Sequence, residues 1–369
     1  MDKLDKIRYF PPKLLDELFV KNNITSNLDI IGKSVLNNPI YSLKIGSGDK
    51  KVLMWSQMHG NETTTTKALF DFYDFLMINI KGRDLIKSLT FYIIFQLNPD
   101  GAYLYTRNNA NGIDLNRDAL CLIEPESRLL IHVFNTFEPD FCFNLHGQRS
   151  IYSVGESNIP STISFLAPSA SYDKKETQAR RIAMQLISVA SNEIIKEHSS
   201  LVARFDDSFN LNCFGDFFTK KRVPTILFEA GHYLNDYYRS YSRKLIFKSL
   251  VRISESIINR SYLKIDHTKY YEIPVNNNDL RDIIIKNVSV LNDKGISTNQ
   301  EIAIQFKEEL VRGRIHFTPL IESMGSNLLL KSSSVYILTK EESLSFLFKY
   351  TIGDNAEKII NRLNLIKNI

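Results

Sequence analysis

The chain has 369 residues, of which 43% are hydrophobic and 24% are charged. The apolar fraction is large enough for a sizeable core and excludes an intrinsically disordered chain, while 15 glycines and 11 prolines exclude a collagenous or linker-rich protein. The 46 basic and 41 acidic residues leave a net charge of +5 that is spread along the chain. The chain has no clustered basic stripe, so its charge gives no indication of a nucleic-acid partner.

Residues 1–19 are charged and lack the apolar stretch of a secretory signal. No apolar run approaches the ~20 residues that a membrane-spanning helix requires. The three cysteines, Cys121, Cys142 and Cys213, have neither the number nor the spacing of a disulfide framework or a CxxC metal motif. Together these features predict a soluble cytoplasmic protein with no membrane partner.

The first two-thirds of the chain alternate between strand-like and helix-like segments. The predicted strands are residues 51–57, 89–96, 140–145 and 225–228, and the predicted helices are residues 62–80, 127–137, 176–197 and 235–261. Asn98-Pro99-Asp100-Gly101 follows the second strand and has the composition of a turn. The alternation predicts an α/β domain around a largely buried sheet.

The pattern changes after residue 261. Short β-branched runs are separated by Asn, Asp and Gly turns, at residues 270–275, 283–291, 301–306 and 334–338. We therefore expect two domains, an α/β domain over residues 1–261 and a small β-rich domain over residues 262–369. The second has no recognisable site, and an interface that forms a homo-oligomer is one role open to it.

Chemically capable side chains follow the predicted strands of the α/β domain. His59 and Glu62 come after the first strand and His146 ends the third, and ligands bind at the carboxyl ends of strands in open α/β sheets. Imidazole and carboxylate groups are zinc ligands, and three of them leave one coordination position open. Taken alone, the HxxE spacing equally suits a turn histidine followed by a carboxylate at a helix N-terminus.

Glu229 follows the largely apolar run Pro224-Thr-Ile-Leu-Phe228, so we expect its carboxylate in a low-dielectric environment. Burial raises a carboxylate pKa and a nearby dication lowers it, which together suit a general base acting on metal-bound water. A helix-capping acid or the partner of a buried arginine remains the alternative. Arg107 and Arg117 flank an Asn-Gly turn, and such guanidinium groups bind carboxylates bidentately, although either could be an ordinary surface arginine.

The ordered set of motifs resembles the M14 zinc carboxypeptidase family over about residues 40–250. The motifs are HGNE (59–62), NPDG (98–101), Arg107, GIDLNRD (112–118), NLHG (144–147) and FEAG (228–231). The resemblance implies a mixed, twisted eight-stranded sheet flanked by helices, with one zinc ion at the strand ends. The predicted fold class is thus α/β, with a small C-terminal β-rich appendage.

The resemblance also assigns roles to individual residues. His59, Glu62 and His146 match the zinc ligands, Glu229 the catalytic base, Arg107 the oxyanion-stabilising arginine, Asn116 and Arg117 the pair that holds the substrate's C-terminal carboxylate, and Asp114 the acid that orients the first ligand histidine. His232 lies beside a matched position and is a candidate pocket residue. These roles imply hydrolysis of a C-terminal peptide bond by zinc-activated water.

Two departures from the family pattern concern the substrate. The tyrosine that digestive members carry on a mobile loop is absent from residues 204–218, and Tyr233 and Phe209 are the candidates to replace it. The residue that sets side-chain preference falls near residues 214–216, where the composition does not indicate a specificity.

Two other functions remain open on the sequence. One is a deacylase of small N-acyl amino acids that resembles succinylglutamate desuccinylase, which shares HxxE, DLNR and the later histidine. The other is a pseudoenzyme, zinc-binding or metal-free, that recognises peptide termini. The substrate is accordingly a peptide or a small acyl-amino acid. Lys220-Lys221-Arg222 is interpreted as a solvated loop before a buried strand.

Overall fold

The computed structural model describes residues 4–198, 200–292, 295–345 and 350–365. Contacts divide the chain into two compact units, with unit 1 formed by Met1–Gln148 and Thr162–Val275 and unit 2 by Arg149–Ser161 and Asn276–Ile369. The domain limits predicted from the sequence, 1–261 and 262–369, stay a prediction. Their outermost residues, 1–3 and 366–369, lie outside the described residues.

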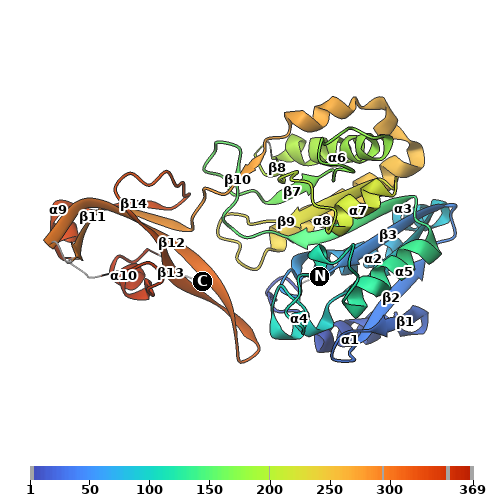
Figure 1. Ribbon diagram of the computed structural model, residues 1–369, viewed down its shortest axis with the longest axis horizontal. Helices are drawn as coiled ribbons and strands as arrows, with labels where there is room; N and C mark the ends of the chain where they lie inside the picture. Colours follow the sequence, from blue (N-terminus) through green and yellow to red (C-terminus); the bar gives the residue numbers. More distant parts are fainter. Residues whose placement is uncertain (1–3, 199, 293–294, 346–349, 366–369) are drawn as a thin grey trace. The chain divides into compact units, whose positions relative to one another are not determined.

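Unit 1 is built on an eight-stranded sheet in the order β1-β2-β4-β3-β5-β9-β7-β8 (Figure 1). Its strands are β1 (Leu28–Lys33), β2 (Pro39–Ile45), β3 (Lys50–Ser56), β4 (Leu89–Ile94), β5 (Phe141–Gly147), β7 (Ile163–Leu166), β8 (Val202–Arg204) and β9 (Thr225–Ala230). The central strands β4, β3, β5 and β9 are mutually parallel, whereas β2 and β7 run antiparallel to their central neighbours. The predicted mixed eight-stranded sheet is confirmed.

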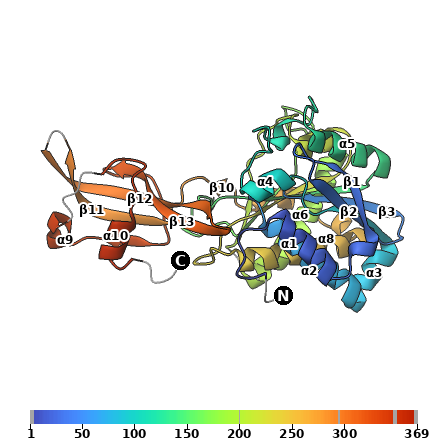
Figure 2. The same ribbon diagram turned by 90° about the horizontal axis from the view of Figure 1, so that it is seen from below.

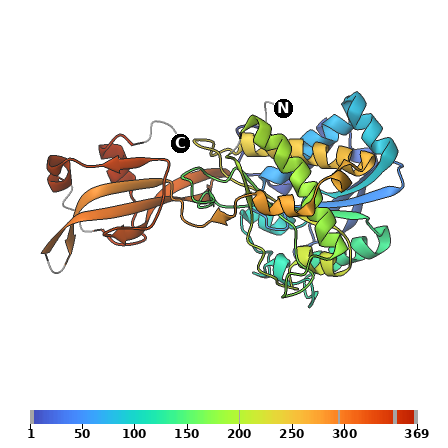
Figure 3. The same ribbon diagram turned by 90° about the horizontal axis from the view of Figure 1, so that it is seen from above.

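Helices cover both faces of this sheet. They are α1 (Pro12–Lys21), α2 (Thr64–Ile78), α3 (Ile80–Ser88), α4 (Pro99–Leu104), α5 (Pro125–Phe137), α6 (Gln178–Glu197), α7 (Phe214–Lys220) and α8 (Ser240–Asn259), with 3-10 turns η1 (Thr25–Asn27), η2 (Leu115–Arg117), η3 (Ser261–Lys264) and η4 (His267–Glu272). Figure 2 shows α2, α3 and α8 on one side and α5 on the other, and Figure 3 shows α6 in lime green crossing α8 in yellow. Each face of the sheet therefore has its own hydrophobic core.

Strand β3 illustrates why the central strands read as continuous apolar runs. Val52 and Met54 belong to the core beneath α2 and α8, whereas Leu53 and Trp55 belong to the core beneath α5 and α7. Successive side chains of a strand point to opposite faces, so a strand covered on both sides needs apolar residues at every position. Polar side chains are then confined to the strand ends.

The NPDG segment forms a helix start where the sequence predicted a turn. The Asn98 side chain accepts a hydrogen bond from Gly101 N at 2.8 Å, and Pro99 occupies the first helical position of α4. Asparagine is a preferred N-cap and proline is favoured directly after it, so the same composition serves a helix N-terminus.

Unit 2 contains a four-stranded sheet in the order β13-β12-β11-β14 and a two-stranded pair of β10 and β6. Its elements are β6 (Ser153–Val154), β10 (Asn276–Asn277), β11 (Ile283–Asn292), β12 (Gly295–Val311), β13 (Arg314–Gly325), β14 (Val335–Ile337), α9 (Lys340–Ser345) and α10 (Glu357–Arg362). Figure 1 shows β12 and β13 as long curved strands, and Arg312 and Gly313, both at positive φ, form the two-residue turn between them. The predicted β-rich appendage is confirmed.

The strand expected at residues 270–275 is wrong. Asp266 caps the 3-10 turn η4 by accepting a hydrogen bond from Thr268 N. The hydroxyl of the buried Tyr270 accepts a hydrogen bond from Ala167 N. The local cap and this distant contact determine the backbone where the apolar spacing suggested a strand. None of the helices in the described ranges has both the length and the hydropathy to cross a bilayer.

Candidate metal centre

His59 and Glu62 lie in the short connection between β3 and α2. Gly60, between them, packs directly on α4, because a Cβ on Gly60 would lie 1.9 Å from the carbonyl carbon of Gly101. Only glycine allows the two backbones to approach so closely. The connection is therefore held against the NPDG segment, and both potential ligands lie beyond the carboxyl end of β3.

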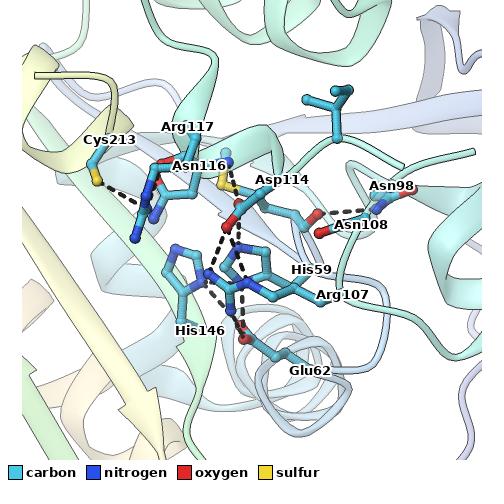
Figure 4. Close-up of polar contacts among 12 residues, drawn as sticks. His59, Glu62, Asn98, Arg107, Asn108, Asp114, Asn116, Arg117, His146 and Cys213 are labelled. Carbon is cyan, nitrogen blue, oxygen red and sulfur yellow. Dashed lines mark hydrogen bonds and ion pairs between the residues drawn. The ribbon is translucent and has the colours of Figure 1, made fainter. Parts of the chain in front are cut away.

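Three side chains converge at this edge of the sheet (Figure 4). His59 Nδ1 lies 2.8 Å from Glu62 Oε1, His146 Nδ1 lies 2.9 Å from Glu62 Oε2, and the two Nδ1 atoms are 3.1 Å apart. His146 comes from β5, which pairs in parallel with β3, so the carboxyl ends of the two strands meet. Gly147 N also donates to Glu62 Oε2 at 2.9 Å, which orients the carboxylate.

The surroundings shift the pKa values of Glu62, His59 and His146 in different directions. Burial by itself would raise the pKa of Glu62, but the two neighbouring histidines hold that pKa well below its usual range. Burial alone would lower the pKa of His59, yet the Glu62 charge and the Asp114 hydrogen bond raise it. Burial dominates at His146 and lowers its pKa. Glu62 is thus an anion that faces two imidazole nitrogens.

Asp114 supports the first histidine from the far side of its ring. Its Oδ1 lies 3.0 Å from His59 Nε2 and accepts from Asn116 N at 2.9 Å, which caps η2. Its Oδ2 accepts from Arg107 Nε at 3.0 Å. Although burial would raise the pKa of Asp114, these partners keep it well below its usual value. In a neutral ring the carboxylate favours the tautomer in which Nε2 carries the proton, which leaves the Nδ1 lone pair available to a bound metal ion.

The three ligand atoms of His59, Glu62 and His146 lie within 4.8 Å of one another, which is the spacing of a metal site. Two imidazole nitrogens and one carboxylate oxygen form a donor set suited to zinc with an open coordination position. Asp114 adds the carboxylate–histidine contact that orients such ligands. The donor chemistry, the tautomer and the spacing all fit a bound divalent metal.

Glu229 lies beside this cluster on β9. The parallel register pairs Glu229 with His146 of β5, so the two side chains project from the same face of the sheet. The carboxyl group is buried, its Oε2 has no hydrogen-bond partner among the described residues, and burial together with the Glu62 charge raises its pKa well above normal. A buried carboxyl group with an unused oxygen can accept and return a proton.

The sequence did not indicate Arg239 as part of these surroundings. This buried arginine donates from Nη1 to the carbonyls of Gln148 and Ala230, at 2.6 and 2.8 Å, and its charge offsets a small part of the rise in the Glu229 pKa that burial causes. Through these two hydrogen bonds Arg239 bridges the carboxyl ends of β5 and β9. No motif marks it, because its role depends on the side-by-side placement of two strands far apart in the sequence.

Arg107, Asn116 and Arg117 lie on the segment above the cluster (Figure 4). Arg107 is 46% exposed and reaches Glu62 Oε1 at 3.4 Å, so it borders both the cluster and solvent. Asn116 Oδ1 accepts from Phe214 N at 3.0 Å, which leaves its amide nitrogen to act as a donor. Arg117 Nη1 donates to the Asn116 carbonyl and to Cys213 Sγ, at 2.7 and 3.2 Å.

The structure does not bring the remaining predicted residues into the His–Glu–His set. The His232 ring packs against Tyr237 with 4.9 Å between ring centroids, and the His232 carbonyl accepts a hydrogen bond from Thr162. Tyr233 packs on Tyr241, 4.5 Å between centroids, and Phe209 packs on Tyr172, 4.7 Å between centroids. In this structure, both candidates for the missing loop tyrosine are therefore packed on other aromatic rings.

Residues 214–216, where the specificity position was expected, belong to the first turn of α7. The buried Asp216 carboxylate accepts hydrogen bonds from the backbone of Ser169 and Asn210, each at 2.8 Å, and burial raises its pKa to about 6. Asn144 on β5 is also buried, and its amide has no partner among the described residues. A neutral amide and an engaged carboxyl group thus flank this region, and the NLHG motif had included Asn144 without giving it a role.

Comparison with known proteins identifies the relatives of this arrangement. Residues 13–152 match the M14 peptidase family, described as zinc carboxypeptidase. The catalytic chain of human carboxypeptidase N is 27% identical over 167 residues, an alignment that covers 32% of this chain and 36% of the human protein. The chain therefore spans little more than a third of the length of that relative. The predicted resemblance to the M14 family is confirmed.

Solved structures show the same fold. A metallo-carboxypeptidase from Burkholderia cenocepacia aligns with a TM-score of 0.52 at 14% identity, over 68% of this chain and 71% of its own. Bovine thrombin-activatable fibrinolysis inhibitor, in complex with tick carboxypeptidase inhibitor, aligns with a TM-score of 0.54 at 15% identity, over 68% of this chain and 98% of its own. At this level of identity the likeness concerns the fold alone.

Proposed function

We propose that this chain, which carries the motifs and the fold of the M14 zinc carboxypeptidase family, is a zinc-dependent carboxypeptidase that hydrolyses C-terminal peptide bonds. The observation that carries the proposal is the convergence of His59, Glu62 and His146 within 4.8 Å, with the unpartnered Glu229 oxygen on the adjacent strand. Zinc held by these three residues would acidify a water molecule and polarise the scissile carbonyl.

Glu229 serves as the general base in this mechanism. Its carboxyl group is buried beside His146, and its free oxygen can take a proton from the attacking water. Arg239 holds the strand ends on which Glu229 and Gln148 lie, so the base is fixed in position. Glu229 then returns the proton to the leaving amine, which completes cleavage of the amide bond.

The arginines provide charge stabilisation and substrate binding. Arg107 lies at the solvent side of the cluster and can donate to the carbonyl oxygen as negative charge develops on it. Asn116 has its amide oxygen occupied by Phe214 N, so its amide nitrogen and the Arg117 guanidinium are the donors available to a substrate carboxylate. This pair would select the C-terminal residue of a peptide.

Glu229→Gln tests the proposal most directly. The variant keeps the size of the side chain and removes the base, so we expect kcat to fall by about 100- to 10,000-fold. Zinc content, measured by elemental analysis, should be unchanged, because the three ligands are intact. Wild-type protein without zinc, together with a Glu229→Gln variant that behaves as wild type, would instead support a peptide-binding pseudoenzyme.

Substrate class is decided by parallel assays of hippuryl peptides and small N-acyl amino acids. The Asn116 and Arg117 donors suit any substrate with a free carboxylate, so a deacylase would use most of the same residues as a carboxypeptidase. We expect turnover of peptides to exceed that of N-acyl amino acids, and the reverse order would identify a deacylase. The cytoplasmic location and a homo-oligomer formed through the C-terminal residues 262–369 stay predictions.

A further inference from the structure

A groove of about 1000 Å³ lies in unit 1 at the edge of the sheet opposite to the metal centre. Lys50 and Phe141, which begin the parallel strands β3 and β5, line it, as does Pro224 directly before β9. The metal centre lies at the carboxyl ends of the same strands. The groove therefore cannot belong to the site described above, and its volume suits a small-molecule ligand.

The groove carries an excess of positive charge. Lys220, Arg222 and Arg260 line it, and none of the three forms an ion pair with any residue in the described part of the chain. The carboxylate in the groove, Asp140, is already engaged, since it accepts from Lys50 Nζ at 2.7 Å and from Lys51 N at 2.8 Å. Three cations thus remain available to an anion.

Two further groups in the groove can donate to an anion. Gln178 and Ala179, the first residues of the 20-residue helix α6, line it, and the first backbone N–H groups of a helix lack partners within the helix and lie at the positive end of its dipole. The Thr219 side chain at the end of α7 is 2% exposed, and its hydroxyl has no hydrogen-bond partner among the described residues. A buried hydroxyl without a partner is costly unless something binds it.

Much of the remaining lining is apolar. Leu89, Ile182, Ile257 and Leu263 contribute to it, and Leu263 remains 57% exposed. We propose that this groove is a second ligand site of the protein, for a small molecule with an anionic head group and an apolar body. The cations, the start of α6 and the Thr219 hydroxyl bind the head group, and the aliphatic side chains cover the body.

The protein contains one reporter for such binding. Trp55 is the single tryptophan and packs edge-on against Phe218, with 5.5 Å between ring centroids. Phe218 directly precedes Thr219 in the sequence, which links Trp55 to the groove. Octanoate and octyl phosphate should bind the 369-residue chain with one-to-one stoichiometry in calorimetry and change Trp55 fluorescence. Octanol, which lacks the charge, and inorganic phosphate, which lacks the apolar body, should each bind at least about tenfold more weakly.

Substitutions in the groove test whether the anionic ligand binds there. Arg222→Gln combined with Arg260→Gln should weaken octanoate binding by about tenfold or more, because two charge-assisted contacts are lost, and Thr219→Val should weaken it less. Lys221→Gln is the matched control, since Lys221 packs over the Phe217 ring, 5.4 Å from its centroid, and does not line the groove. This control should bind as wild type does, and circular dichroism should show that all variants are folded.

Several outcomes would overturn the proposal. Octanol or inorganic phosphate binding as tightly as the anionic amphiphiles would remove the need for a combined head and body site. Undiminished affinity in the Arg222 and Arg260 double variant would place the anion elsewhere. A signal lost in Arg117→Gln but kept in that double variant would assign the binding to the metal centre.

Discussion

Two clusters of buried charge lie along the same strand–helix segment and differ in how completely their members are paired. His59 and Glu62 precede α2, whereas Lys67 and Asp71 lie within its first two turns. In the second cluster Arg243 of α8 donates to Asp71 with Nε at 2.6 Å and Nη2 at 2.5 Å. Lys67 Nζ donates to the carbonyls of Ile7 and Tyr238, at 2.6 and 3.2 Å.

The difference in pairing distinguishes a cluster that stabilises the fold from a cluster that can bind or react. The Lys67–Asp71–Arg243 cluster ties the N-terminal segment and α8 to α2, and each of its charged groups has a polar partner. Around the candidate metal centre, by contrast, Glu229 Oε2 and His146 Nε2 are buried and have no partner in the described part of the chain. Buried polar atoms without partners are costly for stability, and two of them beside the three potential metal ligands suit a site that binds or reacts.

The largest expected effect concerns the structural cluster. Asp71→Ala leaves the buried Arg243 without its bidentate partner, so the free energy of unfolding should fall by about 3–5 kcal/mol, less any compensation by the half-exposed Asp5. Activity of the folded fraction should be unchanged. Asp84→Ala, which breaks the exposed pair with Lys87, is the control and should cost about 0–1 kcal/mol. Equal losses in denaturant unfolding would contradict the distinction.

Arg107→Ala addresses the chemical cluster. Loss of an oxyanion donor typically costs about 2.7–4 kcal/mol, so kcat should fall by about 100- to 1,000-fold. Zinc content should hold, since the three ligands and Asp114 are unchanged and Arg107 only contacts Glu62 and Asp114, at 3.4 and 3.0 Å. Steady-state kinetics with elemental analysis measures both quantities, and Arg83→Ala on α3 is the control for removal of a surface arginine. Near-wild-type turnover would remove Arg107 from this role.

Asp114→Asn should act on the metal itself. The substitution removes the charge that holds His59 Nε2 and Arg107, and changes of this kind typically lower metal affinity by about 10- to 100-fold. Competition with a chelator measures the zinc affinity. An unchanged affinity would show that the ligand geometry does not depend on Asp114.

The smallest effect is a pH dependence of stability. Burial, with the Arg8 charge next, lowers the pKa of Lys67 from 10.5 to about 7 in the folded chain. Between these two values the unfolded chain binds more protons, so the destabilising contribution of Lys67 is complete below pH 7 and is lost as the pH rises toward 10.5. The unfolding free energy of the wild type should therefore rise by at most about 1.4 kcal/mol per pH unit in this window.

Lys67→Met isolates that contribution, because it keeps the length of the side chain and removes the titrating group. Denaturant unfolding at pH 7.5 and 8.5 should show a smaller rise for Lys67→Met than for the wild type. Lys87→Met, at an exposed position of α3, should follow the wild type. A parallel slope for Lys67→Met and the wild type would mean that Lys67 is not the group responsible.

Much of the fold could be predicted because its central strands are covered on both faces and read as apolar runs. The local pattern did not predict β1, β2, β7 and β8, the strands toward the two edges of the sheet. β1 is partly exposed along its whole length and β8 has three residues, so neither shows a usable alternation. The two-stranded pair of β10 and β6 was also missed, because Asn276 and Asn277 have the composition of a loop and only their partner strand makes them extended.

For the site, the sequence determined the chemistry and the tertiary structure determined the neighbours. His59, Glu62 and His146 predicted a metal site only as part of the ordered set of motifs, because the HxxE spacing alone also suits a turn histidine and a helix-capping carboxylate. The pairing of Glu229 with His146, the threefold use of Asp114 and the buried Arg239 depend on strand order and register. Local sequence patterns record periodicity and residue chemistry, whereas contacts between distant segments exist only once the sheet has formed.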